Sequence, residues 1–279
     1  MTDIAARSAA HWSEAGRAGM DAFYTLATDD YRHLAGARDW RKLFLEGERR
    51  GGGHALRLLD VACGSGKFPT ALVAHAGLAE AGLRPVETAL LDPSAFSIAE
   101  AKAALRAPFT VGAEYETTLQ AFVPPAEGYD IVWATHALYA IPEPELAPAL
   151  AVFRRAIAPG GVGIIAHSAA AGHYIGFHRR YLKAFGPAGA AAYVSAETIT
   201  ETLRRAGAEV EIQDIAYDSV ARADETAAVE GFLQRCVFDD SVSLAEMTAT
   251  PPLAEYLRDC RGPEGWRFPQ RVQLITVAG

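Results

Sequence analysis

LLDVACGSGKF, at residues 58–68, carries the clearest structural signal in this chain. An apolar run over residues 56–61 leads into two glycines, Gly64 and Gly66, that are separated by one residue. Such a run predicts a buried strand, and a helical pattern follows it. Glycine permits a tight turn between the two and lets a ligand come close to the backbone. We therefore expect a strand, a ligand-binding turn and a helix.

Two common nucleotide-binding loops do not fit this stretch. A P-loop needs serine or threonine after its Gly-Lys pair, and here Phe68 follows Lys67. A dinucleotide-binding loop needs a third glycine, and Pro69 stands in its place. Asp60 lies on the predicted strand, four residues before Gly64. An anion at this point disfavours a pyrophosphate and favours a ligand with positive charge.

Downstream of this turn, short apolar runs alternate with helical segments. The predicted strands are at residues 88–91, 109–111, 129–133, 163–166, 209–215 and 271–277. The predicted helices are at residues 70–81, 97–106, 145–157 and 195–206. This alternation is typical of βαβ units and predicts an α/β fold with a mostly parallel sheet. In such sheets the ligand lies beyond the carboxyl ends of the strands.

The first fifty residues have a different pattern. They predict a helix over residues 5–27 and a further helical segment that begins near Asp29 and Asp30. Three consecutive glycines end this part of the chain. We expect a helical cap followed by one main domain with two insertions: a cap at 1–50, a domain at 54–279, and insertions at about 169–193 and 218–266.

Composition excludes several classes of protein. The chain has 34 acidic and 26 basic residues, a formal net charge of −8, so we expect no nucleic-acid partner. Its three cysteines form no metal-binding or disulfide pattern, and we expect no metal site. It has no signal-peptide pattern and no apolar run long enough to span a bilayer. We therefore expect a cytoplasmic protein without membrane contact.

The pattern D-x-A-C-G-S-G at residues 60–66 resembles motif I of the class I S-adenosylmethionine-dependent methyltransferases. Asp92, at the end of the next predicted strand, corresponds to the acidic ribose-binding residue of that family. The segment 129–138, the turn 158–161 and the helix 195–206 also match, so the resemblance covers roughly residues 22–216. It implies a Rossmann-like sheet of seven strands, S-adenosyl-L-methionine as cofactor and a small-molecule methyltransferase.

The same resemblance implies which residues bind the cofactor. Asp60, Ala62 and Gly64 are expected at its methionyl part, Asp92 at the ribose and Pro93 at the adenine. An adenine contact is also expected after the third strand, where the match within residues 116–120 is ambiguous by two or three positions. The full expected set is Tyr24, Tyr31, Asp60, Ala62, Gly64, Gly66, Asp92, Pro93, Thr118, Leu119 and Thr135.

Acceptor chemistry is predicted from residues beyond the fourth and fifth strands. The sequence Ala-Thr-His-Ala at residues 134–137 lacks the tetrad of DNA amino methyltransferases, and no Pro-Cys nucleophile stands there. A small-molecule acceptor is therefore expected. Histidine titrates near neutrality, so His136 is the candidate base. The other candidates are His167 and Tyr139 for catalysis, and His173, His178 and Arg179 for substrate contact.

Three functions fit these residues. The first is methyl transfer to nitrogen or oxygen of a small molecule in specialised metabolism. The second is an intramolecular cyclase that consumes S-adenosylmethionine, releases methylthioadenosine and forms azetidine-2-carboxylate or aminocyclopropane carboxylate. The third is a binding module without catalysis. The predicted insertion at about residues 169–193, with His173, His178 and Arg179, favours the first function, because a self-cyclising enzyme has less need of a second pocket. The sequence does not name the acceptor or the oligomeric state.

Overall fold

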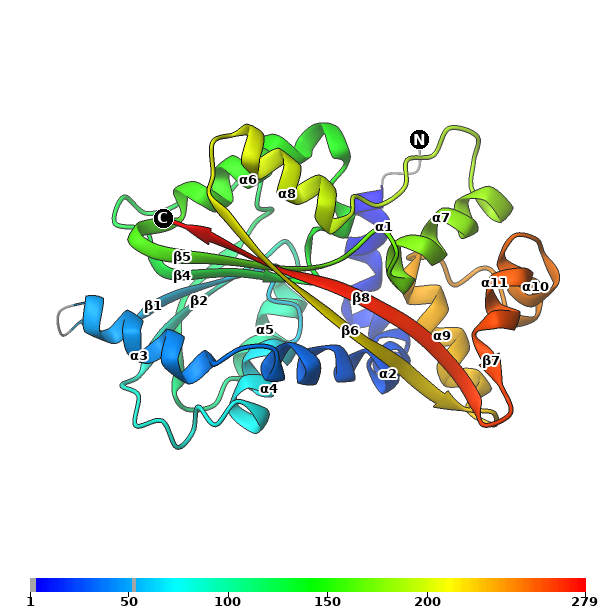
Figure 1. Ribbon diagram of the computed structural model, residues 1–279, viewed down its shortest axis with the longest axis horizontal. Helices are drawn as coiled ribbons and strands as arrows, with labels where there is room; N and C mark the ends of the chain where they lie inside the picture. The colour runs from blue at the N-terminus through cyan, green and yellow to red at the C-terminus, as the bar shows by residue number, and fades with distance from the viewer. Residues whose placement is uncertain (1–3, 52–53) are drawn as a thin grey trace.

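The computed structural model describes residues 4–51 and 54–279. A twisted sheet runs through the molecule with helices on both faces, and further helices gather at one end of it (Figure 1). The strands are β1 Arg57–Val61, β2 Val86–Asp92, β3 Phe109–Glu116, β4 Tyr129–Thr135, β5 Ile157–Ser168, β6 Val210–Arg222, β7 Arg261–Gly262 and β8 Gly265–Ala278. The helices are α1 Ile4–His11, α2 Arg17–Gly36, α3 Trp40–Arg50, α4 Lys67–His75, α5 Ala95–Ala104, α6 Glu143–Arg155, α7 His173–Phe185, α8 Ala196–Arg205, α9 Thr226–Cys236, α10 Leu244–Ala249 and α11 Leu253–Asp259, with single 3-10 turns η1 Glu14–Gly16 and η2 Leu138–Ala140.

The strands are ordered β3-β2-β1-β4-β5-β8-β6, and the short β7 pairs with β8 at its outer end. The first five of this order run parallel, whereas β8 is antiparallel to both of its long neighbours. Helices cover both faces, so the central strands β1 and β4 are almost entirely buried. This architecture confirms the predicted Rossmann-like α/β fold with its mostly parallel sheet.

The N-terminal part departs from the predicted helices. The helix expected over residues 5–27 is interrupted between His11 and Arg17 by η1. Asp29 and Asp30 do not begin a helix but lie inside α2. The helix continues there because Leu26, Ala27, Leu34 and their neighbours form one buried face across that point. The predicted glycine boundary includes residues 52 and 53, which lie outside the described residues.

Strands β6 and β8 extend well beyond the alternating runs that predicted them. They stay paired from Val210 with Val277 out to Arg222 with Gly265, so their outer halves project past the rest of the sheet. In Figure 1 this ribbon reaches the end of the molecule where α7 and α9–α11 gather. The two predicted insertions therefore contain α7 and the group α9–α11, together with the outer ends of these strands.

These segments share a second hydrophobic core with the N-terminal helices. Its buried side chains come from α2, α7, α9, α10 and α11 and from the outer ends of β6 and β8. Helices α2 and α9 cross closely because Gly231 has no Cβ, and a Cβ there would lie 2.6 Å from the Cβ of Ala22. We call this unit the cap; it combines α2, from the helical cap predicted at 1–50, with the helices of both predicted insertions. It closes the end of the sheet where β1, β2 and β4 end.

No helix within residues 4–51 and 54–279 combines the length and the apolarity needed to cross a bilayer.

Candidate active site

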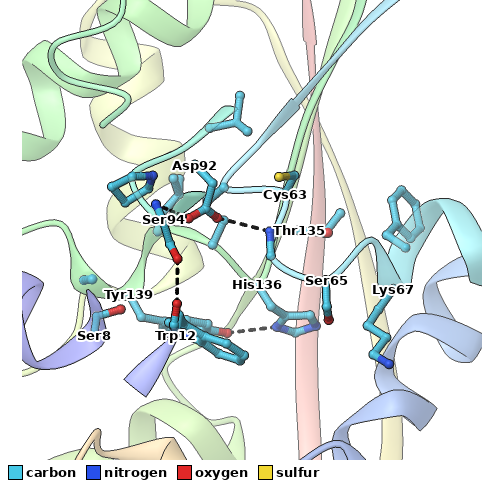
Figure 2. A pocket seen from close by; sticks show the side chains of 18 of the residues that line it. Ser8, Trp12, Cys63, Ser65, Lys67, Asp92, Ser94, Thr135, His136 and Tyr139 are labelled. Atoms are coloured by element: carbon cyan, nitrogen blue, oxygen red, sulfur yellow. Dashed lines mark hydrogen bonds between the residues drawn. The ribbon is translucent and has the colours of Figure 1, made fainter. Parts of the chain in front are cut away.

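A cavity of about 200 Å³ lies between the cap and the carboxyl ends of β1, β2 and β4. Figure 2 shows side chains from the glycine turn, the β2 and β4 ends and the N-terminal helices around it. The predicted site residues that line it are Tyr24, Tyr31, Asp60, Ala62, Gly64, Asp92, Pro93, Thr118, Leu119, Thr135, His136 and Tyr139. The expected set from the glycine turn and from three strand ends is thus brought together in one place.

The glycine turn has the conformation that its sequence predicts. Ala62 and Gly64 both have a φ of +52°, and Gly66 has a φ of +67°. Gly66 does not line the cavity but begins α4, where a Cβ would lie 3.1 Å from the backbone of Ala101 on α5. Its small size therefore serves helix packing, whereas Gly64 faces the cavity. The hydroxyl of Ser65, also in the lining, is buried without a hydrogen-bond partner.

Asp92 fastens the glycine turn to the β2 end. Its Oδ2 accepts a hydrogen bond of 3.1 Å from the amide of Gly64, and its Oδ1 accepts one of 2.9 Å from the amide of Ser94. The Ser94 hydroxyl in turn donates to the carbonyl of Trp12, at 2.7 Å (Figure 2). Burial raises the pKa of Asp92 to about 6, although both amides act in the opposite direction. The N-terminal segment is thereby held over the cavity.

Asp60 is the second carboxyl group in this half of the cavity. It is only 3% exposed, and burial, together with the nearby Asp92, raises its pKa to about 8. Two buried acids close to each other are costly unless a ligand supplies positive charge or hydrogen-bond donors. The arrangement fits a ligand that is cationic at one end and carries hydroxyl groups.

Two basic side chains that the sequence analysis did not select also line the cavity. The Lys67 ammonium lies 4.5 Å from the centre of the Tyr24 ring, at the start of α4. The Arg235 guanidinium from α9 lies 5.0 Å from the Trp12 ring and donates to the carbonyl of Gly16 at 2.9 Å. Lys67 follows directly on the glycine turn, so its position was a usable signal. Arg235 is distant in the sequence and gave none.

His136 lies at the end of β4 in a left-handed conformation, with a φ of +52°. Its Nδ1 is 3.0 Å from the hydroxyl oxygen of Tyr139, which also accepts a hydrogen bond from the Ser168 amide at 3.1 Å (Figure 2). The Ser168 amide occupies only one lone pair of that oxygen, so Tyr139 can either donate to Nδ1 or accept a hydrogen from it. The other ring nitrogen, Nε2, is buried without a partner.

This environment does not match the predicted role of His136 as a base near neutrality. Burial lowers its pKa to about 3, and the neighbouring His167 adds to the effect. The ring is therefore neutral at physiological pH. Proton uptake near neutrality is therefore not its role, and the ring serves as a neutral hydrogen-bonding group.

The remaining histidine candidates lie outside the cavity lining. His167 Nε2 hydrogen-bonds the carbonyl of Val194 at 3.0 Å, and its ring stacks on Tyr139. His173 is buried in the cap between Phe177 and Phe232, with Nδ1 at 2.7 Å from the Tyr256 hydroxyl. His178 accepts from the Tyr193 amide at 3.2 Å, and Arg179 is exposed. The structure therefore gives the three histidines packing contacts, leaves Arg179 at the surface and brings none of the four to the cavity.

A third buried acid, Asp30 on α2, lines the cavity from the cap side. It is 2% exposed, and its Oδ2 accepts a hydrogen bond of 2.5 Å from the Tyr174 hydroxyl on α7. Its Oδ1 has no hydrogen-bond partner. Burial raises its pKa to about 7. The sequence held a signal for this residue, because Asp30 is three residues after Ala27 and four before Leu34 on one buried helix face.

Residues 59–162 match the family model described as "Methyltransferase domain". This range contains the glycine turn, the β2 end and the β4 end that form the cofactor side of the cavity. Residues 59–162 are a methyltransferase domain. No curated protein matches the chain in sequence at a significant level.

The whole chain has the class I methyltransferase fold, as solved structures show. Magnesium protoporphyrin IX methyltransferase from Synechocystis PCC 6803, with bound S-adenosylhomocysteine, is 13% identical; the match covers 99% of this chain and 100% of that chain at a TM-score of 0.53. The plantazolicin methyltransferase BpumL, also with bound S-adenosylhomocysteine, is 11% identical; the match covers 99% and 96% at a TM-score of 0.51. At these identities the likeness concerns the fold. The full-length coverage shows that it extends beyond the domain into the cap.

Proposed function

We propose that this protein transfers the methyl group of S-adenosylmethionine to a nitrogen or oxygen of a small molecule. The observation that carries the proposal is the pair of buried acids, Asp60 and Asp92, at the ends of adjacent parallel strands with the glycine turn between them. A cationic methionyl group and a ribose diol are the two features that such a pair recognises. The methyltransferase domain and the bound product in relatives of the same fold support this choice.

The lining residues suit the parts of this cofactor. Asp60 would face the methionyl ammonium, and Lys67 is the nearby cation for the methionyl carboxylate. Asp92 would accept hydrogen bonds from the ribose hydroxyls through the lone pairs that Gly64 and Ser94 leave free. The unpartnered hydroxyl of Ser65 supplies a further polar group to the same ligand. When bound, the cofactor supplies a methyl group that is already activated by its sulfonium.

The protein's own contribution is position and exclusion of water. Methyl transfer is an in-line displacement, so the acceptor atom must be held against the methyl group. Tyr31, His136, Tyr139 and Tyr174 line the cavity beyond the β4 end, where an acceptor would lie. Trp12, which contacts Ser94 and Arg235, lines the cavity on the side of the N-terminal helices. A cavity enclosed by a cap suits a small-molecule acceptor.

The first experiment is calorimetric titration of the full chain with S-adenosylhomocysteine, followed by mass analysis of a reaction with S-adenosylmethionine alone. A methyltransferase without acceptor should show only slow background decay, because water is excluded from the methyl group. Repeated release of methylthioadenosine would instead assign the intramolecular cyclase. Absence of S-adenosylhomocysteine binding would contradict both functions.

Transfer is then tested with S-adenosylmethionine that carries a labelled methyl group and a panel of small amines, phenols, alcohols and carboxylic acids. Label in any small-molecule product establishes methyl transfer. Tight cofactor binding with neither a labelled product nor methylthioadenosine would favour the binding module.

A further inference from the structure

We propose that the acceptor is an amine that binds in its protonated form against Asp30, and that Asp30 takes the proton that frees the nitrogen for methylation. The proposal rests on the proposed function and names its substrate class. It makes Asp30 a catalytic residue and places the acceptor in the half of the cavity between α2, α7 and the β4 end.

Aromatic rings surround this half of the cavity. The Tyr31 ring lies 6.0 Å from that of His136 at 86°, and the Tyr174 ring lies 5.7 Å from that of His136. Tyr139 lies 5.8 Å from Tyr174 and completes the group. All four side chains line the cavity. Tyrosine rings present a negative face, so a cage of three of them attracts an ammonium group.

The Asp30 carboxyl group borders the cage. A carboxylate that is only 2% exposed is costly unless its charge is matched. The Tyr174 hydroxyl donates a hydrogen bond to one oxygen, Oδ2, and the other oxygen, Oδ1, has no hydrogen-bond partner. Asp30 makes no ion pair with any side chain in residues 4–51 and 54–279. A role in packing alone would leave the ionised carboxylate with one oxygen, Oδ1, without a hydrogen-bond partner.

Among the described residues, the titratable groups with the largest mutual effects with Asp30 come from several elements packed around it, and these groups are acids, tyrosines and a cysteine. They are Asp29 and Tyr31 on α2, Tyr139 on η2, Tyr174 on α7, Tyr217 on β6 and Cys236 on α9. The hydroxyl groups of Tyr174, Tyr217 and Ser219 lower its pKa, and Asp29 raises it slightly, but burial outweighs them and brings it to about 7. A carboxyl group that titrates near neutrality suits reversible proton transfer.

His136, the other acid–base group beside the acceptor, does not take the proton from the substrate ammonium. Burial lowers the pKa of His136 to about 3, so its ring is neutral and does not take up a proton near neutrality. Its Nε2 has no hydrogen-bond partner among the described residues and can hydrogen-bond the substrate, which would make His136 a residue that orients the acceptor. Of the other carboxyl groups in the lining, Asp60 and Asp92 lie at the glycine turn on the cofactor side. Asp30 remains as the group beside the acceptor.

The step is balanced as follows. The substrate ammonium gives one proton to the Asp30 carboxylate and becomes a neutral amine with a free lone pair. That lone pair forms a bond to the methyl carbon, the carbon–sulfur bond breaks, and its electron pair stays on sulfur. The products are a methylammonium, neutral S-adenosylhomocysteine and one proton on Asp30, which passes to solvent before the next turnover.

The test uses the full chain saturated with S-adenosylhomocysteine, so that no methyl group is available. Calorimetry in mildly alkaline buffer compares propylamine with 1-propanol, and benzylamine with benzyl alcohol, since each pair differs only in the charged head. We expect at least one amine to bind about tenfold or more tightly than its alcohol. Asp30→Asn should abolish this preference. Asp29→Asn, which removes a carboxylate from the same helix but one paired with Arg32, should keep it.

Each other outcome overturns the proposal. An alcohol that binds as well as its amine, or four probes that all fail to bind, would exclude a cation site at Asp30. A preference that persists in Asp30→Asn would place the cation elsewhere. If Asp30→Asn weakened S-adenosylmethionine but not S-adenosylhomocysteine and left the amine preference intact, Asp30 would serve the sulfonium instead. Failure of the proposed function is separate, because S-adenosylhomocysteine would then not bind before any amine is added.

A second variant tests the proton. The amine affinity should fall as the pH decreases through the pKa of Asp30, because the charged carboxylate is required. Tyr174→Phe removes a hydroxyl that lowers this pKa, so the midpoint should move to higher pH while binding at alkaline pH is largely kept. A midpoint that stays in place in Tyr174→Phe would contradict the assignment to Asp30. A midpoint still present in Asp30→Asn would do the same.

Discussion

Asp92→Ala should weaken the binding of S-adenosylhomocysteine strongly. In the structure the carboxylate accepts hydrogen bonds from the amides of Gly64 and Ser94, and the proposed ribose contact uses its remaining lone pairs. Loss of charge-assisted hydrogen bonds to a buried carboxylate costs about 1.5–3 kcal/mol, which corresponds to roughly a 10- to 150-fold rise in Kd. The lost anchor of the glycine turn adds to the effect in the same direction.

The two contributions can be separated by a second substitution. Asp92→Asn keeps one carbonyl oxygen that accepts from a backbone amide, but it loses the negative charge. We expect about a third to two thirds of the loss in binding free energy seen in Asp92→Ala, because neutral hydrogen bonds contribute about 1 kcal/mol less than charged ones. Glu116→Ala is the matched control, since Glu116 is the register partner of Asp92 on β3 but is exposed and lies outside the cavity lining.

Isothermal titration calorimetry at neutral pH measures all three variants, and circular dichroism confirms that each is folded. An affinity of Asp92→Ala within twofold of the wild type would refute the assignment of the ribose site. An equal loss in Glu116→Ala would show that the effect is general electrostatics and not a contact.

Three further predictions concern charge and pH. Because the pKa of His136 is lowered to about 3, its ring should show no titration between mildly acidic and alkaline pH by NMR, and a shift near neutrality would contradict the neutral, buried state of this ring. Lys67→Met should weaken S-adenosylhomocysteine binding by about 0.5–1.5 kcal/mol, measured by calorimetry, and unchanged affinity would remove Lys67 from the carboxylate site. Asp30 has a pKa of about 7 in the folded chain and an ordinary value near 4 when unfolded, so the folded state binds more protons between these values and loses stability as the pH rises. Asp30→Asn should therefore raise the free energy of unfolding at alkaline pH by about 2–4 kcal/mol, with little change near pH 4. Urea unfolding measures this, and a variant less stable than the wild type at alkaline pH would refute the predicted direction.

The cofactor side was predictable because its signals are local. Asp60, Gly64 and Asp92 each follow or end an apolar run, and the carboxyl ends of parallel strands meet at one edge. Their positions could be derived from the strand pattern without knowledge of the cap. The same holds for the central strands, whose burial on both faces leaves a continuous apolar run.

The acceptor side was less predictable because a titratable residue in sequence does not reveal which way it faces. The segment around His173 and His178 is as rich in aromatic and polar residues as the segment around His136. In the structure, however, His173 stacks on Phe177 and His178 stacks on Tyr193. Asp30 was interpreted as a helix start because acids are common there. Its place on the buried face of α2 was the contrary signal, and tertiary packing decided between the two.

Strand β8 links the acceptor side to the order in which the chain folds. It follows the other strands in the sequence but lies between β5 and β6 in the sheet, and its outer end supplies Trp266 and Phe268 to the cap. During synthesis the glycine turn and the ends of β1, β2 and β4 are complete long before this strand emerges. The nascent protein should thus acquire its cofactor half first and its acceptor half only after synthesis of residues 265–278. A chain cut before Gly265 should lose substrate selection along with the strand that joins β6 to the rest of the sheet.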